Sequence, residues 1–220
     1  MSVRRLTMIS EIFENNGSVR QYSAHQIIIF QSSELIESFY IKSGYVIVYD
    51  IAPKGEKKIL MILKPGDVFP LIWSMKEHYK ARYFYEAYTD CEIAVLRTEK
   101  LIEQTKANLE FSNYMLEMSV ETIKELMLRL QSLESTSSTH KVGEVFRYLY
   151  RVHSEKNGKW RRVTPPVTHQ TIAEMSALAR ETVSLQTKVL IDAGAVKYEK
   201  QHYHIQAKVL NANLADEEIS

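Results

Sequence analysis

The stretch that decides the fold is residues 167–194, VTHQTIAEMSALARETVSLQTKVLIDAG. Its apolar residues recur at the three- and four-residue steps of a helix on both sides of a short break, SALA. The first half has Thr168 in an N-cap position, with Ile172 and Met175 on one face. We therefore predict two short helices joined by a tight turn.

The second helix is predicted to begin near Arg180 and to end before Gly194, because glycine readily adopts the left-handed conformation after a last helical turn. Its buried face has Val183 and Leu190. Two helices joined by such a short turn cross steeply, which lets the second lie in the major groove of DNA while the first spans the phosphates. The alternative is a pair of ordinary solvated amphipathic helices.

The outward face of the second helix has the chemistry of a base reader. An arginine can donate two hydrogen bonds to guanine, a glutamate can accept from the cytosine amino group, and a leucine offers an apolar contact such as one to a thymine methyl. A lysine one turn further along suits a phosphate contact. The residues of this face are Arg180, Glu181, Ser184, Leu185 and Lys188.

The same residues carry a family resemblance. The segments ARETVSLQTKVL and IDAGAVKYEKQHYHI are similar to the recognition helix and wing of the cyclic-AMP receptor protein and fumarate-nitrate regulator (Crp/Fnr) superfamily. The resemblance implies base contacts from the second helix and phosphate contacts from the first. The predicted DNA-binding residues are Thr168, His169, Gln170, Arg180, Glu181, Thr182, Ser184, Leu185 and Lys188.

Three positions depart from the family pattern. Ala177 stands where relatives have the turn glycine, and an alanine in the left-handed conformation costs about 1 kcal/mol. Ala179 replaces a serine and removes its capping hydroxyl. Leu185 replaces a third reader that is commonly arginine, so we expect a different preferred half-site.

Composition and charge fit a soluble globular protein that binds nucleic acid. The 220 residues are 45% hydrophobic and 25% charged, which suits one to two domains. No apolar run is long enough to span a bilayer and the N-terminus has no signal core, so we predict a cytoplasmic protein without a membrane segment. Residues 141–210 have 12 Lys and Arg against 6 Asp and Glu, a basic excess that a solvated face would also tolerate.

Residues 26–96 alternate between apolar and polar positions in short runs. Gly44, Gly55 and Gly66 recur every eleven residues and mark turns. This pattern predicts a small antiparallel barrel or roll, and FYIKSGYVIVYD and LKPGDVF resemble the β-roll effector domain of the same family. Cys91, the one cysteine, lies in the apolar strand CEIAVL and is predicted to be buried, which excludes an all-cysteine iron-sulfur cluster.

Cyclic-nucleotide members of the family bind the ribose with a glutamate and the phosphate with an Arg-Ser pair. Here the Gly-Glu pair falls on Pro70 and Leu71, and the Arg-Ser pair falls on Ala81 and Arg82. A nucleotide phosphate without these partners is costly to desolvate. We therefore expect that cyclic AMP is not bound in the family manner.

Aromatic residues replace those groups, and two interpretations compete. They could line an apolar effector pocket, or they could fill a barrel that has lost its ligand. Candidate effector contacts are Trp73, Arg82, Tyr83 and Tyr85. No cofactor is predicted; haem sensing through an axial histidine occurs in the family, but no residue here identifies it.

Residues 110–133 follow a helical pattern with a coiled-coil seam, which predicts a parallel helix pair across a dimer axis. The alternative is a helix packed onto its own domain. The seam residues are Leu116, Val120, Ile123, Met127 and Leu130. The predicted domains are a β-roll at 1–109, a dimerisation helix and hinge at 110–138, and a winged helix-turn-helix at 139–220. The acidic tail NANLADEEIS is predicted to fray.

Enzymatic sites are not indicated. The chain has no glycine-rich phosphate loop, no HExxH and no GxSxG, and the pair His202 and His204 is more often structural than metal-binding, so we predict no metal site. The predicted function is a homodimeric transcription regulator that binds double-stranded DNA, with RNA polymerase as a candidate partner. The alternative is an allosteric ligand-binding module that acts through protein contacts without specific DNA binding.

Overall fold

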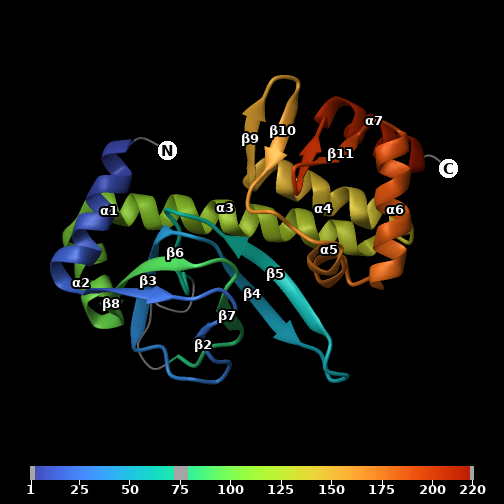
Figure 1. Cartoon of the computed structure of the whole chain (residues 1–220). Helices are drawn as coiled ribbons and strands as arrows, with labels where there is room; N and C mark the ends of the chain where they lie inside the picture. Colours follow the sequence, from blue (N-terminus) through green and yellow to red (C-terminus); the bar gives the residue numbers. More distant parts are fainter. Residues whose placement is uncertain (1–2, 72–78, 219–220) are drawn as a thin grey trace. The chain divides into compact units, whose positions relative to one another are not determined.

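The computed structural model describes residues 3–71 and 79–218. The predicted fold class is confirmed: antiparallel sheets are followed by a long helix and a C-terminal winged helix-turn-helix (Figure 1). Packing divides the chain into two compact units, Met1–Ile123 and Lys124–Ser220. The division falls within the long helix α3 (Leu109–Glu134), so the two parts of this helix belong to different units. Within the described ranges, no helix combines the length and apolar character needed to cross a membrane.

The N-terminal unit has two four-stranded antiparallel sheets, ordered β1-β8-β3-β6 and β2-β7-β4-β5. The alternating runs that predict strands are IIIF, SFYIKSGYVIVYD, KKILMIL and ARYFYEAYTDCEIAVL. They become six of these strands, while β1 and β6 were not predicted. The strand SVRQY is exposed along almost its whole length and has no apolar alternation to signal it. The strands are β1 (Ser18–Tyr22), β2 (Ile27–Ile29), β3 (Glu37–Ser43), β4 (Val46–Ile51), β5 (Lys57–Leu63), β6 (Val68–Phe69), β7 (Phe84–Ala87) and β8 (Cys91–Arg97).

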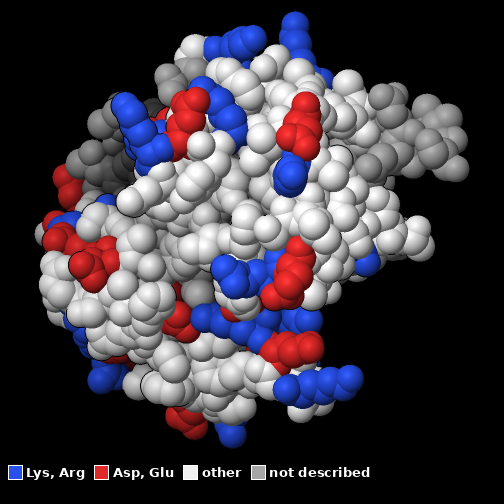
Figure 2. All heavy atoms as spheres, turned by 45° about the vertical axis from the view of Figure 1, so that its right-hand side comes forward, with Lys and Arg blue, Asp and Glu red and all other residues white. Residues whose placement is uncertain are grey.

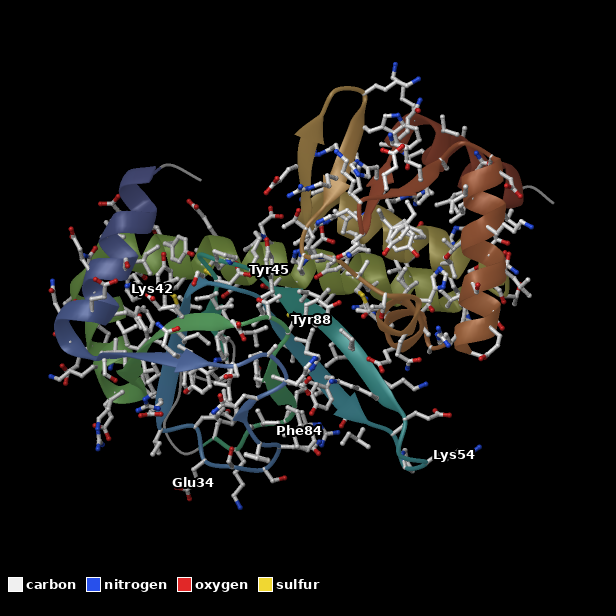
Figure 3. All side chains as sticks on the ribbon, viewed as in Figure 1. Glu34, Lys42, Tyr45, Lys54, Phe84 and Tyr88 are labelled. Atoms are coloured by element: carbon white, nitrogen blue, oxygen red, sulfur yellow. The ribbon has the colours of Figure 1, made fainter. Side chains whose placement is uncertain are left out.

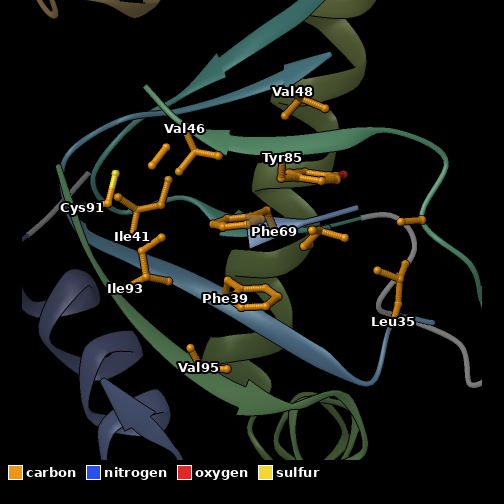
Figure 4. Close-up of a cluster of buried hydrophobic side chains, with 13 residues drawn as sticks. Leu35, Phe39, Ile41, Val46, Val48, Phe69, Tyr85, Cys91, Ile93 and Val95 are labelled. Carbon is orange, nitrogen blue, oxygen red and sulfur yellow. The ribbon is translucent and has the colours of Figure 1, made fainter. Parts of the chain in front are cut away.

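A column of stacked rings fills the interior of the roll (Figure 4). The ring of Phe69 stacks on Phe39 at 5.1 Å and on Tyr85 at 5.3 Å between ring centroids. Cys91 is buried in the same core, as predicted. Gly44 has a φ of 86°, and a Cβ there would lie 2.6 Å from the Cys91 sulfur, so the turn between β3 and β4 requires glycine.

Helices cover the outer face of the β1-β8-β3-β6 sheet. They are α1 (Val3–Asn16), α2 (Thr98–Ala107) and the first part of α3, and the first two were not predicted. Phe13 and Phe111 are fully buried in this second core. The Tyr114 hydroxyl donates a hydrogen bond of 2.5 Å to the Gly66 carbonyl, which ties α3 to the turn before β6.

The C-terminal unit packs helices against a small antiparallel sheet ordered β11-β12-β10-β9. The helical pattern of KVGEVFRYLYRVHSEK predicts five inward side chains, Val142, Val145, Phe146, Leu149 and Tyr150. The first helix of this unit buries the first four, but Tyr150 is half-buried and Tyr148 is the buried tyrosine. The elements are α4 (Ser138–Val152), β9 (Ser154–Asn157), β10 (Trp160–Val163), α5 (His169–Ser176), α6 (Arg180–Asp192), β11 (Val196–Glu199), β12 (His202–Ile205) and α7 (Ala207–Glu218).

The prediction of a frayed tail is wrong, because α7 continues to Glu218. Leu210 and Leu214 lie one turn apart and are each 1% exposed. Gly143 on α4 makes room for Leu214, since a Cβ at this position would lie 2.4 Å from a Leu214 methyl carbon. Burial of these two leucines stabilises α7, although the C-terminal part of this helix is acidic.

Candidate nucleic-acid interface

Helix α5 begins at the predicted cap. The Thr168 hydroxyl accepts a hydrogen bond of 3.0 Å from the backbone N–H of Thr171, and the Thr171 hydroxyl lies 3.5 Å from the Thr168 N–H. Together they form a capping box, which satisfies donors that the first turn leaves without helical partners. Ile172 and Met175 are buried, as predicted.

The turn between α5 and α6 contains the strain that the sequence predicts. Ala177 has φ 55° and ψ 39°, which is the left-handed conformation. The resemblance implies a glycine at this position. Ala179 is the N-cap of α6 and makes no side-chain capping hydrogen bond. Both departures therefore cost stability at the joint between the two helices, about 1 kcal/mol for the left-handed alanine alone.

Helix α6 is anchored on one side and closed by glycine. Val183 and Leu190 are buried as predicted. At its C-terminus, Gly194 donates 2.9 Å to the Ile191 carbonyl and Ala195 donates 3.0 Å to the Leu190 carbonyl, with φ 72° at Gly194. This is the hydrogen-bond pattern of a Schellman motif, so the predicted end of the helix is confirmed.

The side chains predicted to contact DNA bases lie on the opposite side of α6. Leu185 is 65% exposed, and Thr182 is half-buried. Val189, one turn after Leu185 and 50% exposed, extends the apolar part of this face. It was not predicted, because an apolar residue within a helical pattern is read as a core position. The exposed members of the predicted set are Arg180, Glu181, Ser184, Leu185 and Lys188.

The first turn of α5 holds the predicted phosphate contacts. Thr168 and Gln170 are exposed, and the Gln170 amide donates 2.9 Å to the Glu174 carboxylate. His169 is half-buried and its ring centroid lies 6.3 Å from that of Tyr203. Burial lowers the pKa of His169, and the nearby positive charge of Arg180 lowers it further.

Charges of both signs are interspersed on the face of the protein shown in Figure 2. On this face, basic and acidic side chains form small groups separated by uncharged surface. Arg161 donates 2.9 Å to the Ser154 carbonyl and lies 4.9 Å from the centre of the Tyr150 ring, so it has a structural role. The basic excess of the C-terminal sequence is therefore partly used within the fold.

The paired histidines of the wing are engaged with the protein. His202 Nδ1 lies 2.8 Å from the Val163 carbonyl oxygen, and His204 is buried. Across the described parts of the chain, no three His, Cys, Asp or Glu side chains cluster as metal ligands would.

Helix α3 has two different apolar faces. Phe111 and Met115 are fully buried against the N-terminal unit. The predicted seam points elsewhere and is open to solvent in the single chain, which distinguishes it from a face packed on its own domain. Its side chains are Leu116, Val120, Ile123, Met127 and Leu130, with exposed fractions of 63%, 53%, 49%, 67% and 65%.

The candidate effector residues of the roll do not share one environment. Tyr85 is part of the buried ring column, Tyr83 is half-buried beside it, and Arg82 is exposed. Trp73 lies outside the described residues. Phe84 precedes Tyr85 in β7, so it lies on the other side of the sheet, and its ring stacks on Tyr49 at 5.1 Å between ring centroids. Figure 3 labels Phe84 among the side chains of the N-terminal unit.

The two positions that correspond to the family's charged nucleotide contacts, the glutamate and the arginine, are apolar and buried here. Leu71 is 8% exposed and Ala81 is 3% exposed. The backbone N–H of Ala81 donates a hydrogen bond of 2.8 Å to the Ser33 carbonyl, and the Ala81 carbonyl accepts one of 2.7 Å from the Ser32 N–H. Both backbone groups of Ala81 are therefore hydrogen-bonded within the roll. Neither side chain can supply a charge to a ribose or a phosphate.

Two family models match the chain. The cyclic nucleotide-binding domain matches residues 19–108, and the Crp-like helix-turn-helix domain matches residues 145–211. No curated protein sequence matches the chain.

Solved structures have the same fold at low identity. FixK2 from Bradyrhizobium japonicum is 16% identical, with a TM-score of 0.75 over 89% of this chain and 96% of its own. A CooA mutant from Carboxydothermus hydrogenoformans is 20% identical, with a TM-score of 0.75 over 90% of this chain and 88% of its own. CLP from Xanthomonas campestris, a c-di-GMP responsive global regulator, is 14% identical, with a TM-score of 0.73 over 90% and 98%. With both domain models matched in this order, the chain belongs to the Crp/Fnr superfamily of DNA-binding transcription regulators.

Proposed function

We propose that this protein is a homodimeric transcription regulator that reads a specific DNA sequence with α6 in the major groove. The observation that carries the proposal is the division of α6 into two sides. Val183 and Leu190 anchor one side, while Arg180, Glu181 and Leu185 are exposed on the other. A helix held in this way can enter the groove with its N-terminal half against base edges.

The capped N-terminus of α5 supports the phosphate contacts of the proposed complex. The helix dipole places partial positive charge at this end, and Thr168 and Gln170 are exposed beside it. Such contacts fix the register of the protein on the duplex without reading sequence.

The exposed seam of α3 supports the dimer. Five large apolar side chains at heptad spacing are about half to two-thirds exposed in the single chain. Pairing with the same stripe of a second copy removes this surface from water. Two copies related by a two-fold axis would read a pseudo-palindromic operator with half-sites about 34 Å apart.

The roll is proposed to act without the family's cyclic-AMP contacts. Leu71 and Ala81 lack the required charges, and the rings of Phe39, Phe69 and Tyr85 fill the interior. Any effector would therefore bind through other groups. We place the protein in the cytoplasm, with RNA polymerase as its expected partner.

Selection of bound duplexes from a random-sequence pool tests the proposed function. The expected result is enrichment of one pseudo-palindromic sequence whose binding weakens steeply with salt. Absence of enrichment at low salt would contradict the proposal. It would leave the alternative, a ligand-binding module that acts through protein contacts.

A further inference from the structure

Arg129, in the C-terminal part of α3, contacts the last turn of α5. Its Nη2 donates a hydrogen bond of 2.8 Å to the carbonyl oxygen of Met175. Helix α5 ends at Ser176, and the chain leaves the helix at Ala177. The Met175 carbonyl is therefore among the last four of the helix, which have no helical N–H partner. Arg129 supplies a donor to it from another helix.

The surroundings of Arg129 favour a fixed position for its guanidinium. The guanidinium carbon lies 5.7 Å from the centre of the Tyr148 ring, within the range of a cation-π contact. Burial lowers the pKa of Arg129, but an arginine remains charged in proteins. Its positive charge also lies at the C-terminus of α5, where the helix dipole is negative.

The contact lies immediately before the strained turn. Ala177 is left-handed and Ala179 lacks a capping side chain, so neither residue adds a side-chain hydrogen bond to hold the turn. The backbone N–H groups of Ala177 and Leu178 both donate to the Ala173 carbonyl. A small hollow lined by Arg129, Tyr148, Met175 and Ser176 adjoins the contact. Only Ala177, Leu178 and Ala179 lie between the end of α5 and the start of α6.

We propose that Arg129 is a positioning residue, which ties the dimerisation helix to the turn of the helix-turn-helix and so sets the orientation of α6 for specific reading. The proposal rests on the proposed function of α6. It predicts that loss of the Arg129 contact loosens the turn and lowers sequence discrimination, while the dimer and the fold persist.

The test compares Arg129→Met with a matched control, Arg151→Met. Arg151 on α4 donates 2.9 Å and 3.2 Å to the carboxylate of Glu125, so it also joins α3 to a second helix but does not touch α5. Three quantities are measured in the full chain. They are amide hydrogen exchange at Ala177 and Leu178 without DNA, affinity for the selected operator, and affinity for a duplex of unrelated sequence.

In Arg129→Met, exchange at Ala177 and Leu178 is expected to become about tenfold faster or more, as for the loss of one hydrogen bond to a charged group. Affinity for the operator falls by a similar factor, and affinity for the unrelated duplex does not change. Arg151→Met leaves both the exchange and the affinity ratio as in the original chain. Arg129→Lys keeps the charge and one donor, so it restores part of the ratio and provides the test if the methionine variant does not fold.

Unchanged exchange and an unchanged affinity ratio in both Arg129 variants would overturn the proposal. An equal loss in Arg151→Met would also overturn it, since the effect would then be one of general stability. If the unsubstituted chain selects no sequence at all, the proposed function fails. The exchange at Ala177 and Leu178 then still decides whether Arg129 holds the turn.

Discussion

The backbone N–H of Ala177 donates a hydrogen bond to the Ala173 carbonyl, and this bond closes α5 with Ala177 in the left-handed conformation at φ 55°. Replacement of Ala177 by glycine should therefore raise the free energy of unfolding by up to about 1 kcal/mol, because glycine adopts this conformation without a Cβ clash. Urea denaturation of the two proteins measures the change.

Ala193 provides the matched control. It is also an exposed alanine at a helix C-cap, but its φ of −73° is right-handed. Ala193→Gly should lower the free energy of unfolding by about 0.5 to 1 kcal/mol. A loss of stability in Ala177→Gly as well would show that the turn is not strained.

The dimer is tested at the centre of the seam. Ile123→Glu places a charge within the proposed helix pair, where two copies would bring two carboxylates together in an apolar contact. We expect the variant to be a monomer by light scattering at micromolar concentration, while the original chain is a dimer. Val19→Glu, at a 44% exposed apolar residue of β1, should leave the dimer intact. A monomeric original chain would contradict the dimer.

The stability of the C-terminal unit should depend on the protonation of His204. Burial lowers the pKa of His204 below its ordinary value of 6.5, and Lys197 adds to the shift. The unfolded chain then binds a proton more readily than the folded chain, so the free energy of unfolding falls as the pH drops below 6.5 towards the folded pKa. Denaturation between about pH 7.5 and 5.5 should give a shallower slope for His204→Gln. An unchanged slope would refute the assignment.

Cyclic AMP should not bind through the family's contacts. Calorimetry with the full chain is expected to give no binding heat at micromolar concentrations, since Leu71 and Ala81 present no charge to the nucleotide. If micromolar binding appears and Arg82→Ala abolishes it, the exposed Arg82 replaces the missing arginine and the prediction is wrong. Lys54→Ala, at the tip of the β4–β5 turn (Figure 3), is the control for nonspecific loss of charge.

The periodicity of apolar residues is sufficient to predict α5 and α6, the two helices of the helix-turn-helix. Val183 and Leu190 define the buried side of α6 by spacing alone, and Gly194 marks its end by conformational preference. The left-handed turn at Ala177 came from the family resemblance, because alanine itself favours no such conformation.

Contacts between distant residues could not be read from the sequence. Arg129 and Met175 are 46 residues apart, and nothing in either local pattern links them. The strand SVRQY is exposed and carries no period-two signal. The acidic composition of residues 211–220 predicts a solvated tail, because the burial of Leu214 depends on space left by Gly143 on another helix.

The most direct test of the central claim is the base-preference profile of the operator half-site, measured for the original chain, Arg180→Ala and Leu185→Arg. Arg180→Ala should cost about 1 to 3 kcal/mol at the base pair it contacts and relax the preference there. Leu185→Arg should move the preference at its base pair from thymine towards guanine. Lys188→Ala should weaken binding to all sequences alike, since a phosphate contact carries no base information. Profiles that stay the same in both Arg180→Ala and Leu185→Arg, with affinity retained, would contradict the account, because α6 would not be the reading helix.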